Sequence, residues 1–271
     1  MHLGRDRVIG AYELDGVVVD PGPSSCLETL LDGLEAEPRA LLLTHIHLDH
    51  AGASGSLVAR FPDLRVYVHE VGAPHLVDPE RLLRSASRLY GDDMERLWGA
   101  VLPVPAANVV ALSGGEEIEG FRVAYAPGHA THHVAYLHEA TGDAYVGDVA
   151  GVRIPPHEFT LAPTPPPDID VEAWERSLET IAGWTPQRLC LTHFEGVEEV
   201  GPQLERLRAG LRANAERARS GHRERFLASL EADVENQVDP EAGARMRQAA
   251  PPLLLWLGLE RYWKTRERSV T

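Results

Sequence analysis

The chain has 271 residues, enough to bury about 70–75% of its unfolded surface and to form one large domain with an appendage. Its formal net charge of −15 is uneven: residues 1–200 hold 13 Arg against 31 Asp or Glu, giving −18, and residues 201–271 hold 13 Lys or Arg against 10 Asp or Glu, giving +3. Because an acidic surface repels phosphate backbones, this distribution argues against a nucleic-acid partner.

Cysteine usage and hydropathy set further limits. Cys26 and Cys190 lie far apart and form no Cys-x-x-Cys motif, so no disulfide framework is expected. The first seven residues lack the apolar segment of a signal peptide, and no run reaches the roughly 18 apolar residues of a membrane span. We therefore expect a cytoplasmic protein with no membrane partner.

Apolar or β-branched runs alternate with helical patterns along the first 200 residues. Residues 24–34 begin with cap-type serines and place leucines on one helix face, and residues 52–60 and 79–98 predict further helices. The order predicts an α/β fold with two sheets covered by helices, although composition alone leaves a doubly wound sheet open. The predicted strands lie near residues 16–20, 40–44, 65–69, 121–126, 133–138, 143–147 and 187–191.

After residue 200 the sequence becomes helical and rich in arginine. Helices are predicted over residues 202–219, 222–235 and 241–266, with a break at the two prolines 251–252. We therefore divide the chain into a main domain, residues 1–200, and a helical appendage, residues 201–271. The apolar run 253–259 is too short to span a bilayer, so it either packs on the main domain or forms a homodimer contact.

The strongest chemical signal is the stretch THIHLDH at residues 44–50, directly after the apolar run 41–43. Imidazole and carboxylate are the usual ligands of zinc and neighbouring metals, and such close spacing lets one loop supply two ions. Three further signals also follow short apolar runs: His129 after Pro-Gly, Asp148 after Tyr-Val-Gly, and His193 after Leu-Thr.

In this order the motifs resemble the metallo-β-lactamase superfamily, over residues 8 to about 196. That family's pattern is His-x-His-x-Asp-His, then a histidine, an aspartate and a last histidine, and all seven positions are filled here, as in glyoxalase II-type members. The nearest resemblance is to small prokaryotic hydrolases of the superfamily. It implies the αβ/βα metallo-β-lactamase sandwich, with ligands gathered at one edge and a C-terminal helical appendage.

The resemblance also implies two divalent metal ions, with zinc as the main candidate and iron or manganese as alternatives. The seven ligands would divide between the ions, with His45, His47 and His129 on one, Asp49, His50 and His193 on the other, and Asp148 bridging both. Asp49 and Asp148 would be the catalytic carboxylates, with Asp49 orienting the attacking hydroxide.

Two neighbouring positions leave alternatives open. Asp20 ends an early strand and either fixes the second ring nitrogen of a ligand histidine or serves as an ordinary turn residue before Pro-Gly. His133 offers a second register beside His129, but the family's Gly-His position selects His129.

Tyr90 and His157 are the candidate substrate contacts. Tyr90 belongs to the helices of residues 79–98, which would either cover the site or simply pack on the sandwich. His157 lies in the proline-dense loop 155–167, which would either form a pocket wall or serve as a crossover.

The implied activity is dinuclear metal-dependent hydrolysis of a small-molecule ester, thioester or lactone through a metal-bridging hydroxide. Nucleases of the superfamily that carry a large inserted domain need more than the 44 residues between Asp148 and His193. The rival function is a mononuclear iron-dependent oxygenase of the persulfide dioxygenase type, with two histidines and the aspartate on one metal. A third possibility, a binding protein that uses metal only for stability, is disfavoured. Its metal site would not need a coordination position left open for hydroxide.

Overall fold

The computed structural model describes residues 1–270. By its internal contacts the chain divides into two compact units, which are described separately. The first unit comprises Met1–Tyr125 and His132–Ala140, and the second comprises Ala126–Thr131 and Thr141–Thr271. These units follow from contacts in space, whereas the predicted boundary at residue 200 divides the chain in sequence. The predicted boundary therefore stays a prediction.

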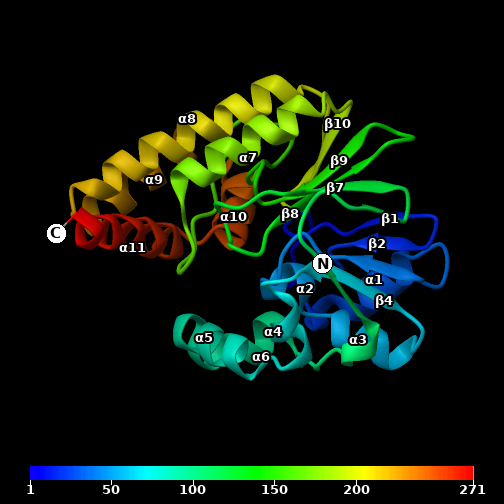
Figure 1. The fold of residues 1–271 in the computed structure, drawn as a ribbon. Coiled ribbons are helices and arrows are strands. Elements are labelled where there is room, and N and C mark those ends of the chain that lie inside the picture. The colour runs from blue at the N-terminus through cyan, green and yellow to red at the C-terminus, as the bar shows by residue number, and fades with distance from the viewer. Residues whose placement is uncertain (271) are drawn as a thin grey trace. The chain divides into compact units, whose positions relative to one another are not determined.

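The first unit is built on a five-stranded sheet in the order β1-β2-β3-β4-β5 (Figure 1). Strands β1 and β2 form an antiparallel hairpin, and β2 to β5 pair in parallel. Strands β2 and β3 are fully buried runs of Val and of Ala and Leu, as expected of parallel strands covered on both faces. The strands are β1 (Tyr12–Leu14), β2 (Val17–Val19), β3 (Ala40–Leu42), β4 (Arg65–His69) and β5 (Val109–Leu112).

The same unit contains an antiparallel set of three strands. These are β6 (Glu117–Ile118), β7 (Phe121–Tyr125) and β8 (Val134–His138). Strand β7 pairs with both β6 and β8, with Phe121 opposite His138 and Tyr125 opposite Val134.

Short helices cover the five-stranded sheet of the first unit. Side chains of Leu27, Leu30 and Leu31 pack against a core that includes Leu41 and Leu43, which confirms the predicted helix face. The helices are η1 (Ser24–Cys26), α1 (Leu27–Gly33), α2 (Leu48–Ala51), α3 (Ser54–Arg60), α4 (Ala73–Val77), α5 (Glu80–Tyr90), η2 (Gly91–Asp93), α6 (Met94–Trp98) and η3 (Ala106–Asn108).

The predicted serine caps are wrong. No side chain caps the start of η1 or of α1. Instead the Ser24 hydroxyl donates to the carbonyl of Gly52 at 3.0 Å, and the Ser25 hydroxyl donates to the carbonyl of Leu97 at 2.7 Å. Both hydroxyls therefore donate to carbonyls that are distant in sequence, and do not accept from the first N–H groups of the helix.

The second unit combines three strands with five long helices (Figure 1). Strand β10 pairs in parallel with β9 and antiparallel with β11. The predicted strands near residues 143–147 and 187–191 and the predicted C-terminal helices, including the break at residues 251–252, are confirmed. The elements are β9 (Asp143–Gly147), α7 (Val171–Gly183), β10 (Arg188–Leu191), β11 (Glu195–Val197), α8 (Val200–Arg219), α9 (Arg223–Gln237), α10 (Pro240–Ala249) and α11 (Pro252–Val270).

Helix α7 was not predicted, although its signals are in the sequence. The Asp170 side chain accepts from the backbone N–H of Ala173, as an N-cap does. Trp174, Leu178 and Ile181 then follow at helical spacing and are fully buried.

The apolar run 253–259 packs within the second unit. Leu255, Trp256 and Leu259 are buried, and a Cβ on Gly258 would lie 1.9 Å from the carbonyl oxygen of Thr164. This contact favours the packing alternative, and a homodimer stays an untested prediction.

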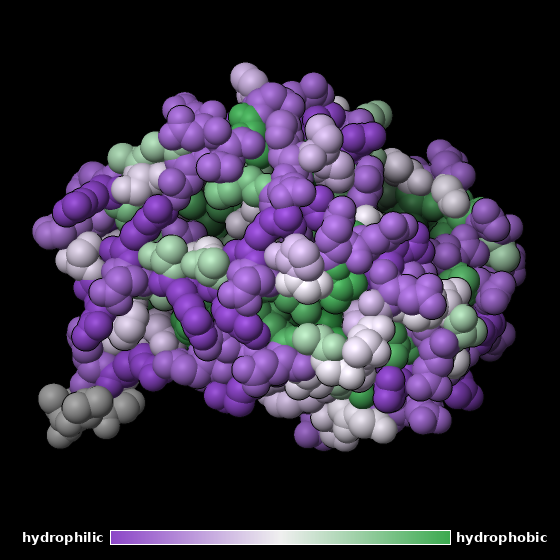
Figure 2. Space-filling view, turned by 90° about the horizontal axis from the view of Figure 1, so that it is seen from above, coloured by the Kyte–Doolittle hydropathy of each residue, from purple (hydrophilic) through white to green (hydrophobic). Residues whose placement is uncertain are grey.

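Three further features concern the surface, the helices and the cysteines. On the face seen in Figure 2, hydrophobic side chains lie mainly in recesses between hydrophilic ones. Within residues 1–270, no helix is long and apolar enough to cross a membrane. Both Cys26 and Cys190 are free cysteines, as expected.

Candidate metal centre

The THIHLDH stretch begins where β3 ends. The backbone N–H of Leu43 still donates to Tyr67 of β4, and the chain then leaves the sheet. The carbonyl of His47 accepts from the N–H groups of His50 and Ala51, at 3.0 and 2.9 Å, so His47 stands immediately before α2. Asp49 and His50 therefore occupy the first turn of that helix.

Asp20 organises these residues from the end of the neighbouring strand β2. Its buried carboxylate accepts from the N–H of Thr44 at 2.8 Å, from the Thr44 hydroxyl at 2.7 Å and from Nδ1 of His50 at 2.8 Å. Asp20 adopts φ +49°, a left-handed conformation that aspartate tolerates better than most residues. Of the two alternatives for Asp20, the contact with Nδ1 of His50 is the one in which it fixes the second ring nitrogen of a predicted ligand histidine.

The same hydrogen bonds fix which nitrogen two imidazoles present. Nδ1 of His50 donates to Asp20, which leaves Nε2 as the metal-facing atom. Because the Thr44 hydroxyl donates to Asp20, it accepts from Nδ1 of His45, 3.1 Å away. Both rings are therefore held in the tautomer that offers Nε2 to a metal.

The first unit brings its own donor atoms together. Nε2 of His45 and Nδ1 of His47 lie 2.9 Å apart. Two nitrogens on one tetrahedral zinc ion are expected to lie about 3.3 Å apart, so this pair can face a single ion after a small adjustment. Asp49 Oδ2 lies 4.0 Å from Nε2 of His50, and the Asp49 side chain keeps 20% of its surface exposed.

The second unit brings together the other three predicted ligands, with His129 and His193 on either side of Asp148. One carboxylate oxygen, Oδ2, lies 3.3 Å from Nε2 of His129, and the other, Oδ1, lies 3.5 Å from Nε2 of His193. All three side chains are buried. Each oxygen faces a different imidazole, and both separations are compatible with atoms that share a metal.

His129 is fixed from behind by a carbonyl and an aromatic ring. Its Nδ1 donates to the Pro163 carbonyl at 2.8 Å, which leaves Nε2 facing Asp148. The Trp174 ring stands edge-on to His129 with centroids 5.5 Å apart. Gly128 precedes His129 with φ +131°, and a Cβ there would lie 2.3 Å from Cα of Trp174, so only glycine fits.

The donor chemistry of both units fits divalent metal ions. The donors are imidazoles and carboxylates, all buried except the partly exposed His47 and Asp49, and three of the imidazoles have their second nitrogen held by an acceptor. Within residues 1–270, the His, Cys, Asp and Glu side chains that could hold a metal come only from the seven predicted positions.

The remaining histidines have structural surroundings. His133 and His132 stack against His45, with centroids 4.8 and 6.1 Å apart. His69 stacks on Tyr125, and burial lowers its pKa although Glu70 and Glu116 oppose the shift. The expectation that these histidines are not ligands stays a prediction.

The two candidate substrate residues have protein partners. Tyr90 stands edge-on to Trp98, with centroids 5.1 Å apart, and burial together with the Asp49 charge raises the pKa of its hydroxyl. Nε2 of His157 lies 2.8 Å from Asp239 at the start of α10. The substrate roles of Tyr90 and His157 stay predictions.

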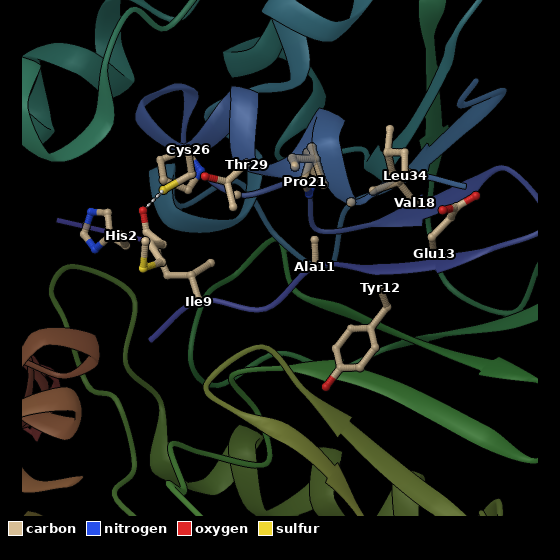
Figure 3. A pocket seen from close by; sticks show the side chains of 15 residues that line it. His2, Ile9, Ala11, Tyr12, Glu13, Val18, Pro21, Cys26, Thr29 and Leu34 are labelled. Carbon is tan, nitrogen blue, oxygen red and sulfur yellow. Dashed lines mark hydrogen bonds between the residues drawn. The ribbon is translucent and has the colours of Figure 1, made fainter. Parts of the chain in front are cut away.

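A pocket of about 250 Å³ lies beside the loop that follows Asp20 (Figure 3). Its walls include Ile9, Val18, Pro21 and the half-buried Cys26, whose Sγ donates to the Met1 carbonyl. The same loop contacts α2, because the N–H of Gly22 donates to the carbonyl of His50.

Several supporting residues were missed from the sequence. Thr44 lies inside the ligand motif, and its position beside His45 is the signal that could have identified it. Its hydroxyl bonds both Asp20 and Nδ1 of His45. Trp174 and Gln203 carry no local motif that marks them, because the backbone groups they bind are distant in sequence.

Comparisons of the sequence and of the structure with known proteins point to the same family. The model for the "Metallo-beta-lactamase superfamily" matches residues 8–193. The "metallo-beta-lactamase fold-containing protein ST1585" of Sulfurisphaera tokodaii is 28% identical over 186 residues, covering 65% of this chain and 67% of ST1585. A crystal structure of ST1585 from Sulfolobus tokodaii superposes with a TM-score of 0.68 at 22% identity, over 95% of this chain and 94% of that one.

Two other relatives bear on chemistry. Hydroxyacylglutathione hydrolase of Thermosynechococcus vestitus is 30% identical over 131 residues, so the match spans 48% of this chain and only 42% of that relative. The crystal structure of TTHA1623 in a di-iron-bound form has a TM-score of 0.59 at 28% identity, over 76% of this chain and 97% of that one.

The predicted αβ/βα fold is confirmed by the family match and by the structural likeness to ST1585. The family and the hydroxyacylglutathione hydrolase relatives support a metal-dependent hydrolase. On the match over residues 8–193, the chain belongs to the metallo-β-lactamase superfamily.

Proposed function

We propose that the protein is a dinuclear metal-dependent hydrolase of a small-molecule ester, thioester or lactone. The observation that carries this proposal is the Asp148 carboxylate, whose two oxygens face two different buried imidazoles at 3.3 and 3.5 Å. A carboxylate placed in this way has one oxygen available for each of two ions.

The proposed ligand division follows the family pattern. One ion takes His45, His47 and His129, the other takes Asp49, His50 and His193, and Asp148 is shared. The tautomers of His45, His50 and His129 support this division, since each ring has its second nitrogen held by a protein acceptor. Imidazole and carboxylate donors favour zinc, and the di-iron form of TTHA1623 makes iron the first alternative to test, before manganese.

Two bound divalent ions would activate water at neutral pH and polarise the substrate carbonyl. The chain supplies the orientation: Asp20 and the Pro163 carbonyl hold the ligand rings in place. The Asp49 carboxylate, which is partly exposed, can accept a hydrogen bond from the attacking water and hold its proton at Oδ.

The substrate class is supported by the hydroxyacylglutathione hydrolases, whose matched segment includes about half of this chain. Because less than half of that relative is spanned, we extend to this protein the cleavage of an acyl bond and not the recognition of glutathione. An acidic chain of net charge −15 also suits a small substrate better than a polyanion.

The test combines metal analysis with a substrate panel of aryl esters, acyl thioesters and acyl lactones. We expect two ions per chain and metal-dependent turnover, both lost in His47→Ala and Asp148→Ala and both kept in His222→Ala, an exposed histidine before α9. One iron per chain with oxygen uptake and no hydrolysis would establish the oxygenase alternative instead.

Two further experiments test the expected cellular location and the possible homodimer. Cell fractionation tests the expected cytoplasmic location, and light scattering after gel filtration tests whether the chain forms a homodimer.

A further inference from the structure

The backbone immediately after Asp148 is held by two buried side chains from different helices. Trp174 of α7 donates through Nε1 to the carbonyl of Val149 at 2.8 Å. Gln203 of α8 donates through Nε2 to the carbonyl of Ala150 at 2.9 Å. Both side chains are 0% exposed, so neither carbonyl can take water as a substitute without a local opening.

The turn that these carbonyls belong to is tightly packed against α8. The N–H of Gly151 donates back to the carbonyl of Asp148 at 2.9 Å. Gly151 adopts φ +88°, and a Cβ there would lie 2.7 Å from Leu207 of α8. The direction in which Asp148 leaves the backbone therefore depends on where α8 lies.

The other end of the Gln203 amide contacts the segment that pairs with His193. Its Oε1 lies 3.4 Å from the Thr160 hydroxyl, which also donates to the Glu158 carbonyl at 3.1 Å, and accepts from Nη1 of Arg153 at 3.5 Å. Arg153 donates its N–H to the carbonyl of His193 at 2.7 Å and accepts from the N–H of Phe194 at 3.1 Å. One amide thus contacts both the turn that follows Asp148 and the side chain of Arg153, the residue whose backbone pairs with His193.

We propose that Gln203 is a positioning residue of the metal centre. It holds the backbone that carries Asp148 by bonding to the carbonyl of Ala150 in the turn that follows, and its Oε1 contacts the side chain of Arg153, whose backbone pairs with His193. The first turn of α8 then belongs to the catalytic apparatus, although the sequence places it in an appendage. This inference rests on the proposed metal-binding function and extends it beyond the seven ligands.

The direct test is Gln203→Met, which keeps the length and volume of the side chain but removes both hydrogen-bonding groups. The matched control is Asn214→Met, another buried amide on α8, whose Oδ1 accepts from Arg217 in the same helix. Both substitutions bury an apolar chain in place of an amide, so both can lower stability, but only Gln203 contacts the turn after Asp148.

Three quantities are measured for each variant: Tm of the metal-free protein, metal affinity by chelator competition, and kcat with KM. We expect Gln203→Met to weaken metal affinity about 10- to 100-fold, the range found when the supports of metal ligands are removed. Asn214→Met should change Tm alone. In Gln203→Met the kcat measured at saturating metal should also fall, with KM little changed, because the ligands are present but displaced.

A second variant separates the two bonds, and its Tm is measured beside its metal affinity. Gln203→Glu keeps the acceptor oxygen beside Thr160 and Arg153 and loses the donor to Ala150, so we expect it to weaken metal affinity as well. Wild-type metal affinity in Gln203→Met, or an equal loss in Asn214→Met, would overturn the proposal. A wild-type protein that binds two ions but turns over none of the panel would refute the proposed substrate class and leave the role of Gln203 intact.

Discussion

At the scale of single residues, the metal centre depends on acceptors that are not themselves ligands. Asp20 holds His50 directly and His45 through Thr44, so one carboxylate sets two imidazole tautomers. Its own position follows from strand pairing, because β2 and β3 are parallel and end at the same edge of the sheet.

The substitution Asp20→Asn tests this role. Asparagine has the same shape and tolerates the positive φ of this position, but one acceptor oxygen becomes an amide donor. We expect metal affinity to fall about 10- to 100-fold with little change in secondary structure, measured by chelator competition and circular dichroism.

The matched control is Asp15→Asn in the turn between β1 and β2, where φ is +49° as at Asp20. Asp15 is exposed, so its substitution should leave metal affinity unchanged. Equal effects at the two positions would mean that Asp20 acts only on the stability of the turn.

Tyr90 can be tested for substrate contact by comparing two substitutions. Tyr90→Phe keeps the edge-on packing on Trp98 and removes only the hydroxyl, which remains protonated at working pH because burial raises its pKa. If the hydroxyl donates to substrate, Tyr90→Phe should raise KM several-fold with unchanged metal content. Unchanged kinetics in Tyr90→Phe, with lower stability in Tyr90→Ala, would assign the residue to packing alone.

At the scale of elements, the β6–β7 hairpin is joined to the five-stranded sheet through Glu119 in its turn. The Tyr67 hydroxyl donates to Glu119 Oε1 at 2.7 Å, and the Arg39 guanidinium pairs with Oε2. Burial alone would raise the pKa of Glu119, but the bonds from Tyr67 and Arg39 outweigh it and hold the pKa below its ordinary value of 4.5.

This shift predicts a stability contribution with a defined pH dependence. A carboxylate whose pKa is lowered on folding stabilises the protein above its unfolded pKa, and the contribution is lost as pH falls through the folded pKa. Glu119→Gln should therefore lower the free energy of unfolding by about 1 kcal/mol at pH 7, and by less at pH 4 and below.

Urea unfolding at a series of pH values measures this difference. Glu117→Gln, an exposed substitution on β6 of the same hairpin, serves as the control and should have little effect at any pH. A Glu119→Gln deficit that stays constant down to pH 3 would contradict the ionic contribution.

At the scale of the whole molecule, charge separates small substrates from nucleic acids. The chain carries a net charge of −15 and holds a single lysine, Lys264. Affinity for a polyanion requires cations that neutralise phosphates, and here 26 basic residues are outnumbered by 41 acidic ones. We expect neither binding nor cleavage of RNA or DNA at physiological salt.

The measurement incubates metal-loaded protein with labelled single-stranded RNA beside the ester, thioester and lactone panel, with Asp148→Ala as the inactive control. Metal-dependent cleavage of RNA, together with no turnover of the small substrates, would favour a nuclease.

Much of the fold could be predicted because its signals are local. The predicted strands near residues 16–20, 40–44 and 143–147 each contain a short apolar run, and all three are confirmed as β2, β3 and β9. The strands that were missed, β1, β5, β6 and β11, are short or partly exposed, so their patterns resemble those of loops.

The sequence by itself determined the family and the candidate ligands. Ligand residues that follow strands directly are visible as motifs, since strand and ligand are adjacent in the chain. His45 to His50 after β3 and Asp148 after β9 are such cases.

Only the tertiary structure decided what holds those ligands. The Pro163 carbonyl reaches His129 across 34 positions, Trp174 reaches Val149 across 25, and Gln203 reaches Ala150 across 53. Buried polar groups must find partners, but which partner is near depends on how helices pack, and no local pattern encodes that. The ligands were therefore readable from the sequence, and the residues that orient them were not.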